Sequence, residues 1–158
     1  MSSKKMTRAE LLQAIGDEGR NNSTSNVLFH QANAESLGLN TTDYKCLGII
    51  IEQGAISAGE LSDLTGLTSG SMTTALDRLE KSNFVRRVAD PNDRRRVLIE
   101  ANLERMPELE VLFNDFLEAL AETMRHYTDD ELAVILDYLQ RTTALYYEQA
   151  SKVKDKNA

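Results

Sequence analysis

Two capped helices meeting at a glycine limit the folds open to this chain more than any other pattern in it. Ser57 followed by Glu60 forms a capping-box pattern, which predicts a short helix over about residues 58–65. Gly66 can end that helix, and Thr68 can cap a second one. A helix, a three-residue turn containing glycine and another helix together predict a helix-turn-helix.

The second helix of the pair, over about residues 68–82, has two chemically different faces. A helical period of about 100° per residue places an apolar core face on one side, made of Met72, Ala75, Leu76 and Leu79. The other side carries small and hydroxyl residues first and charged residues later: Gly70, Ser71, Thr73, Thr74, Asp77, Arg78 and Lys81. A helix that enters the major groove of DNA by its N-terminus needs this order, because small residues approach base edges and long cations reach phosphates.

Gly70 strengthens this interpretation, since glycine inside a helix costs about 1 kcal/mol relative to alanine. Close approach to DNA would justify that cost. An ordinary amphipathic surface helix, rich in serine and threonine on its outer face, is the alternative interpretation.

A β-hairpin with a charged tip should follow the helix pair. The segments "FVRRVAD" and "RRVLIEA" alternate as two short strands do, and "DPND" between them is rich in turn residues. Arg94, Arg95 and Arg96 then lie at the tip, where they can reach an adjacent minor groove or its phosphates. A solvated charge run is the alternative.

The charge of the whole chain and the charge of this region point in opposite directions. A formal net charge of −7 argues against a polyanionic partner. Residues 78–97, however, carry seven cations and only three carboxylates. A basic patch on an acidic body can still bind a phosphate backbone, because counterion release depends on the charges at the contact surface.

Long helices should flank this central region. The first is expected over about residues 7–37, with a polar weak spot at "GDEGRNNSTS" that could break it, and another over 42–53. Two more are expected over about 106–126 and 129–152. Their broad apolar faces predict a dimer formed by the terminal helices. These faces include Leu109, Leu112, Phe113, Phe116, Leu120 and Met124 on one, and Leu132, Ile135, Leu136 and Leu139 on the other.

Several classes of protein are disfavoured. No apolar run approaches the roughly 20 residues of a membrane span, so we expect a cytoplasmic protein. Cys46 is the single cysteine, which excludes an internal disulfide and a multi-cysteine metal site. His30 and His126 are isolated, and no catalytic or phosphate-binding motif is present, so we expect neither an enzyme nor a cofactor or metal.

The stretch "LTSGSMTTALDRLEKSNFVRRVADPNDRRR" resembles the recognition helix and wing of the MarR family of winged helix-turn-helix transcriptional regulators. The resemblance implies a mainly α fold with a small β-hairpin, in which residues 38–102 form the DNA-binding lobe. It implies that residues 1–37 and 103–158 contribute the first, fifth and sixth helices to a homodimer interface. By position it assigns DNA binding to Ser69, Ser71, Thr73, Thr74 and Arg78 on the recognition helix and to Arg94 and Arg95 on the wing, with Asp93 bracing the wing arginines. Gly70, on the same helix face, and Arg96, at the hairpin tip, complete the predicted DNA-binding residues.

Two positions depart from the family pattern. Asn83 stands where a glycine is usual, and Asn tolerates the left-handed backbone that this turn needs. Ala101 and Asn102 replace the usual Leu-Thr, so the start of the fifth helix is not defined by the pattern.

The resemblance also implies a sequence-specific repressor of a pseudo-palindromic operator, relieved by a small aromatic or anionic ligand. By position, the ligand would contact Phe29, His30, Asn33, Tyr44 and Phe113. For His30 and Tyr44 a packed structural role is the alternative. A winged-helix module that binds protein, and a redox-sensing regulator acting through Cys46, are the alternative functions.

Overall fold

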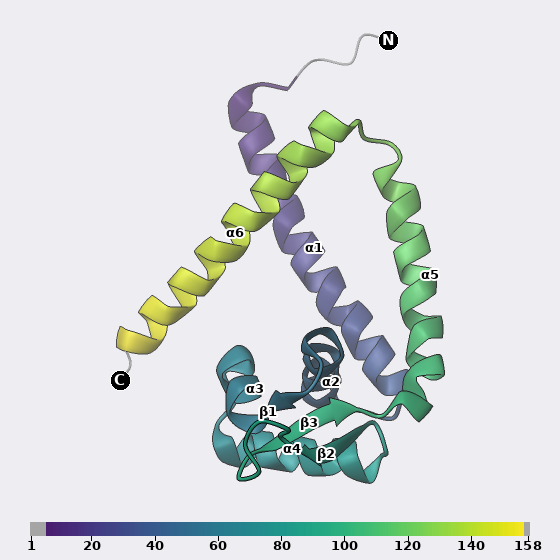
Figure 1. The fold of residues 1–158 in the computed structure, drawn as a ribbon. Helices are drawn as coiled ribbons and strands as arrows, with labels where there is room; N and C mark the ends of the chain where they lie inside the picture. The colour runs from purple at the N-terminus through teal and green to yellow at the C-terminus, as the bar shows by residue number, and fades with distance from the viewer. Residues whose placement is uncertain (1–5, 157–158) are drawn as a thin grey trace. The chain divides into compact units, whose positions relative to one another are not determined.

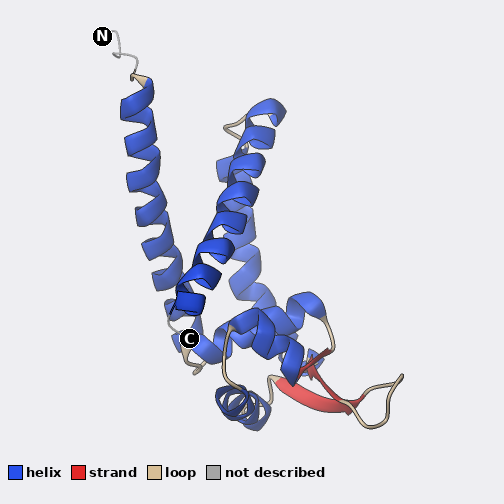
Figure 2. Cartoon of the chain, turned by 90° about the vertical axis from the view of Figure 1, so that its left-hand side faces the viewer, coloured by secondary structure: helices blue, strands red, loops and turns tan. Residues whose placement is uncertain are grey.

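The computed structural model describes residues 6–156, without the side chains of Glu108, Leu112, Lys154 and Asp155. This part of the chain is mainly helical with one small sheet (Figures 1 and 2). The elements are α1 (Arg8–Ser36), α2 (Thr41–Gln53), β1 (Ile56–Ser57), α3 (Ala58–Thr65), α4 (Ser69–Lys81), β2 (Val85–Ala89), β3 (Val97–Ala101), a 3-10 turn (Leu103–Arg105), α5 (Met106–Met124) and α6 (Asp129–Lys156). They form two compact units, the first ending at Leu109 and the second beginning at Glu110.

The predicted helix-turn-helix is confirmed. Ser57 caps α3 in a complete capping box with Glu60, and Gly66 ends the helix in the left-handed conformation at φ 73°. Thr68 then caps α4 by accepting a hydrogen bond from the backbone N–H of Ser71. These local interactions determine where α3 ends and where α4 begins, so the position of the turn follows from contacts between near neighbours in the sequence.

The first helix is not broken at its glycine-containing segment, contrary to the weak spot expected there. α1 runs without interruption from Arg8 to Ser36. Thr7 and Glu10 form a capping box at its start, and the hydroxyl of Thr24 donates to the carbonyl of Arg20 at 3.1 Å. Each exposed glycine destabilises a helix by about 1 kcal/mol relative to alanine. In a helix of 29 residues, the other helical residues offset this cost.

The sheet has three antiparallel strands in the order β1-β3-β2. The hairpin has the predicted form: Val85 faces Ala101 at its base and Ala89 faces Val97 near its tip. The strand β1 was not predicted. It has two residues, with Ile56 paired to Ile99, and two residues cannot display an alternating pattern.

The core of the first unit lies where α2, α3 and α4 meet the sheet. The predicted inward face of α4 is confirmed, since all four of its apolar residues are buried. The largest fully buried hydrophobic side chains of this unit are Phe84, Leu47, Ile50, Leu61, Met72, Leu76, Leu79 and Leu109.

The turn between α4 and β2 shows how the chain accommodates its two departures from the family pattern. Asn83 has φ 60°, the left-handed conformation that asparagine adopts more readily than most residues. The side chain of Asn102 donates to the carbonyl of Asn83 at 3.1 Å, and its backbone N–H donates to Phe84 at 2.8 Å. Asn102 therefore joins the end of β3 to this turn, before α5 begins at Met106.

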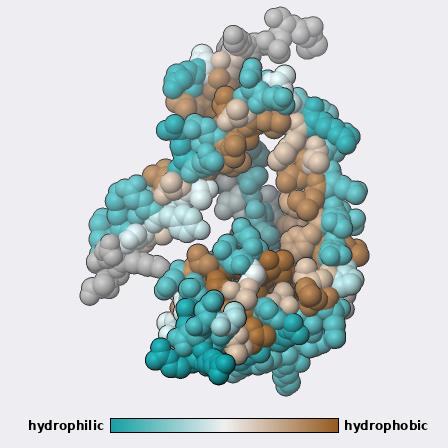
Figure 3. Space-filling view, in the orientation of Figure 1, coloured by the Kyte–Doolittle hydropathy of each residue, from teal (hydrophilic) through white to brown (hydrophobic). Residues whose placement is uncertain are grey.

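The second unit is formed by the remainder of α5 and by α6, which Thr128 and Glu131 cap as predicted. Hydrophobic side chains are open to the surface along α5 (Figure 3). Leu112, predicted on this apolar face, has its side chain outside the described residues. In residues 6–156, no helix combines the length and apolar content that a membrane span requires.

Candidate nucleic-acid interface

The outer face of α4 carries the residues predicted to contact DNA. Its buried side packs into the core, and the opposite side is exposed. The exposed predicted residues are Ser69, Gly70, Ser71, Thr73, Thr74 and Arg78. The helix therefore presents a small, hydroxyl-rich first turn to solvent.

The two threonines of this face use their hydroxyl protons within the helix. Thr73 Oγ1 donates to the carbonyl of Ser69 at 2.9 Å, and Thr74 Oγ1 donates to Gly70 at 3.0 Å. Their methyl groups and oxygen lone pairs are therefore what these side chains offer to another molecule. Methyl groups on a groove-facing helix suit contact with the methyl group of thymine.

Gly70 has no structural reason to be glycine. A Cβ atom added there would meet no other atom within 4 Å, and the residue is not among those with positive φ. Alanine would thus fit the fold and favour the helix by up to about 1 kcal/mol. The absence of a side chain at this exposed position is what a close-approaching partner requires.

A shallow depression of about 630 Å³ runs along this face. Asn40 and Thr42, at the start of α2, lie on its rim beside the first turns of α4. Its lining residues are Asn40, Thr42, Leu67, Gly70, Ser71, Thr74 and Arg78. Sequence reasoning missed the α2 residues, because nothing local indicates that they adjoin α4.

Arg78 lies on the predicted face, but its guanidinium group is bonded to a carboxylate of α2. Arg78 Nε and Nη2 donate to Asp43 Oδ2 and Oδ1, both at 2.7 Å. The Asp43 side chain is 2% exposed and that of Arg78 is 46% exposed. Asp43 was not singled out in the sequence, since an acidic residue in the first turn of a helix already has a local explanation.

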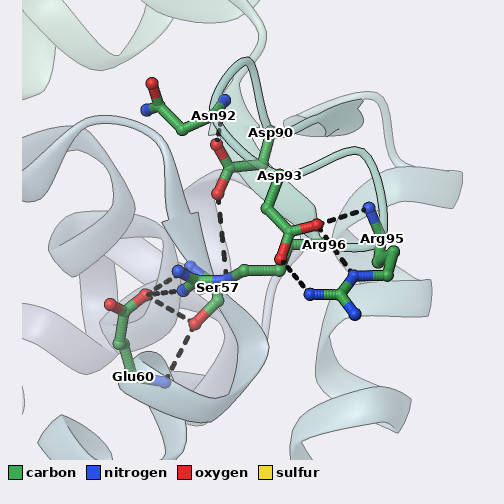
Figure 4. Close-up of polar contacts among 7 residues, drawn as sticks. All are labelled: Ser57, Glu60, Asp90, Asn92, Asp93, Arg95 and Arg96. Carbon is green, nitrogen blue, oxygen red and sulfur yellow. Dashed lines mark hydrogen bonds and ion pairs between the residues drawn. The ribbon is translucent and has the colours of Figure 1, made fainter.

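The tip of the hairpin is braced by aspartates (Figure 4). Asp93 accepts from the backbone N–H of Arg95 at 3.0 Å and from its side chain at 3.2 and 3.3 Å. These hydrogen bonds from Arg95, first those of its side chain, lower the pKa of the Asp93 carboxyl. The Arg95 side chain is 90% exposed. Asp93 therefore orients a guanidinium group that remains open to a partner, as the resemblance implied.

Arg96 is directed differently from the other wing arginines. Its guanidinium group lies 3.6 Å from Glu60 and 3.8 Å from Asp90, and Figure 4 shows it pointing to Glu60 of α3. Asp90 is 7% exposed and also accepts from the backbone N–H of Asn92 at 2.8 Å. Arg96 thus connects the tip loop of the wing to the helix-turn-helix.

Two of the four remaining basic side chains of residues 78–97 are also paired. Arg86 bonds to Glu100 at 2.6 Å, and Arg87 bonds to Asp77 and Glu80. Within residues 6–156, Arg94 and Lys81 have no ion pair. The fold thus divides the seven cations of residues 78–97 into groups held by carboxylates and groups open to a new anionic partner.

The residues predicted to contact a ligand are divided between the two units. Asn33 and Tyr44 are buried, and Asn33 Nδ2 donates to Tyr44 Oη at 3.3 Å. The His30 ring lies 5.7 Å from that of Tyr44 and 5.6 Å from that of Phe29. Phe113 belongs to the second unit. Tyr44 has the packed, hydrogen-bonded environment of a structural residue, and the ligand contact itself stays a prediction.

Cys46 is fully buried in α2, with 0% of its surface exposed. Burial, and then the charge of Asp43, raise the pKa of its thiol. Because the thiolate is the reactive form, this environment disfavours a redox sensor.

We expect Cys46 in the folded protein to react with iodoacetamide at pH 7.5 at least about tenfold more slowly than in urea-unfolded protein, since both burial and a raised pKa suppress the thiolate. The measurement is a time course of alkylation by mass spectrometry. Equal rates in the two states would show an accessible thiol and restore the redox alternative.

The fold and exposed surfaces define a winged helix-turn-helix protein with a groove-compatible helix and a cationic wing. The MarR family model matches residues 39–97. The chain is 39% identical to the HTH-type transcriptional regulator YcgE of Bacillus subtilis over 148 residues, covering 94% of this chain and 96% of YcgE. The chain therefore belongs to the MarR family and is a DNA-binding transcriptional regulator, in a family whose members are not enzymes.

Two solved structures show the same fold. A MarR family protein from Bacillus stearothermophilus gives a TM-score of 0.68 at 18% identity, covering 90% of this chain and 99% of that one. A MarR variant from Escherichia coli, solved in complex with operator DNA, gives 0.56 at 23% identity, covering 87% and 99%. The HTH-type regulator MhqR of Bacillus subtilis is 27% identical over 104 residues, covering 66% of this chain and 72% of MhqR.

Proposed function

We propose that this regulator is a homodimeric repressor that places two copies of α4 in successive major grooves of a pseudo-palindromic operator. The observation that carries the proposal is the outer face of α4. It is exposed, it begins with small residues, and its Gly70 has no structural role. A surface with these properties can approach base edges closely.

The division of labour between helix and wing follows from the available side chains. The first two turns of α4 contain no Asn, Gln or Arg, so strong bidentate contacts to bases are missing there. Methyl groups of Thr73 and Thr74 are suited to thymine. Arg94 and Arg95 would then read the width of the adjacent minor groove, whose negative potential attracts guanidinium groups.

The experiment is fluorescence anisotropy with the promoter fragment of the protein's own gene, against a scrambled duplex, over a series of salt concentrations. Operator binding should exceed scrambled binding and should weaken steeply with salt, by a logarithmic slope of about 0.9 for each phosphate contacted. Weak binding without such a slope would instead favour a protein-interaction module.

The proposed dimer rests on exposed hydrophobic side chains of the long helices. On α6, Leu139 is 53% exposed and Tyr146 is 72% exposed, and their spacing of seven residues places them on one face. α5 adds Val111, Phe116 and Leu117. Surfaces of this kind on a chain of this size are typical of protein–protein interfaces.

Leu139→Asp is expected to convert the dimer to monomer, because a carboxylate buried without a partner opposes association by several kcal/mol. Size-exclusion chromatography with light scattering measures the mass. Ala144→Asp is the control, since Ala144 is exposed on the opposite side of α6 and the charge change is the same. A monomeric wild-type protein, or a Leu139→Asp protein that stays dimeric, would contradict this interface.

Relief by a small aromatic or anionic ligand completes the proposal. It is supported by the aromatic group of Phe29, His30 and Tyr44 at the end of α1 and in α2. A thermal-shift screen with aromatic acids, followed by release of labelled operator by each hit, tests this part. Ligands that raise the melting temperature without releasing DNA would contradict the relief mechanism.

A further inference from the structure

Asp43 is a buried carboxylate with an unusually complete set of partners. Its Oδ2 accepts from Arg78 Nε at 2.7 Å and from Asn40 Nδ2 at 2.9 Å, while its Oδ1 accepts from Arg78 Nη2 at 2.7 Å. The Asn40 side chain in turn caps α2 by accepting from the backbone N–H of Asp43. One guanidinium group therefore joins α4 to the capped start of α2 through two parallel hydrogen bonds.

The burial of Asp43 makes this ion pair hard to exchange. If Arg78 turned to a DNA phosphate, the carboxylate, 2% exposed, would lose its only cationic partner among the described residues. Leaving a buried charge without its partner is strongly destabilising. An ion pair between Arg78 and a phosphate at a solvent-exposed surface would contribute much less than this loss. Arg78 therefore cannot readily leave Asp43 to contact a phosphate of the DNA backbone.

The position of Arg78 gives the pair a geometric effect. Arg78 follows Ser71 by seven residues and Thr74 by four, so all three share the outer face of α4. Both Arg78 and Asn40 line the depression along that face. A bidentate bond from this face to α2 fixes the rotation of α4 about its axis, and with it the direction of Ser71 and Thr74.

We propose that Arg78 is a positioning residue: its bond to Asp43 sets the rotation of the recognition helix and keeps the Arg78 charge away from the DNA phosphates. The pair thus favours selectivity over general affinity for DNA. The resemblance to the family implies a direct contact between Arg78 and DNA, and only the bond to Asp43 of α2 distinguishes the two roles.

The experiment uses the full-length protein and measures binding to its promoter fragment and to a scrambled duplex, each over a salt series. Asp43→Asn keeps the shape of the side chain and releases the guanidinium group. We expect tighter binding to scrambled DNA, a salt slope larger by about one phosphate contact, and an operator-to-scrambled ratio at least about tenfold lower. A purely structural role would give no gain in binding to scrambled DNA.

Arg78→Gln is measured beside Asp43→Asn, and the double variant Asp43→Asn with Arg78→Gln removes both charges so that neither is left buried alone. We expect the double variant to keep the wild-type salt slope, because no phosphate contact has been lost. A slope smaller by about 0.9 in the double variant would show that Arg78 contacts a phosphate, and would overturn the proposal.

Arg95→Gln is the comparison for a direct contact, since its side chain is 90% exposed. A reduced slope in that variant, with an unchanged slope in the double variant, separates the two kinds of arginine. Circular dichroism melting confirms that each variant is folded at the binding temperature. Unchanged scrambled binding by folded Asp43→Asn would also overturn the proposal.

Discussion

Replacing Arg94 and Arg95 together by alanine is expected to abolish operator selectivity while leaving the fold intact. Within residues 6–156, Arg94 has no ion pair, and Arg95 is bonded only to the half-buried wing residue Asp93. Each groove-reading arginine is worth about 1–3 kcal/mol, so the double variant should bind operator at least about 30-fold more weakly. The measurement is a gel-shift competition between operator and scrambled DNA.

The control for this variant must lose the same charge elsewhere. Arg125 and Arg141 lie in the second unit, and their side chains are 74% and 78% exposed. Arg125 is paired with Glu122 and Arg141 with Asp137. Their double alanine variant should keep operator selectivity. If the wing variant competes as the wild type does, or if both double variants lose selectivity equally, the wing does not read the groove.

Replacing Gly70 by leucine is expected to separate folding from DNA binding. Because a Cβ atom there meets no other atom within 4 Å and leucine favours the helix, the free energy of unfolding should be unchanged or higher by up to about 1 kcal/mol. Operator binding should nevertheless weaken by at least about 3 kcal/mol, because the added side chain holds α4 away from base edges. Thermal melting and anisotropy titration give the two quantities.

Gly59 offers a matched control for Gly70. Both glycines are the second residue of an exposed helix start, Gly59 in α3 and Gly70 in α4. A Cβ atom at Gly59 would make only an ordinary contact with Ser57 at 4.0 Å. Gly59→Leu should therefore fold and bind operator normally. Tight operator binding by the Gly70→Leu protein would show that this face of α4 does not enter the groove.

The helices and the hairpin were predictable because their signals are local. Ser57 with Glu60 and Thr128 with Glu131 satisfy backbone groups three residues away, so these helix starts can be read from a few letters. The buried and exposed faces of α4 follow from its period in the same way. Local signals failed at two elements. α1 is unbroken because a long helix outweighs the weak helix propensity of one segment, and β1 was missed because a strand of two residues shows no alternating pattern.

The sequence by itself determined where the helix-turn-helix lies, which face of α4 is buried and where the wing arginines are concentrated, because capping, periodicity and turn chemistry act between near neighbours. Only the tertiary structure decided which cations remain available. Asp43 meets Arg78 across 35 positions, and Glu60 meets Arg96 across the first unit. An ion pair depends on distance in space, and the order of residues along the chain does not specify that distance before the chain is folded.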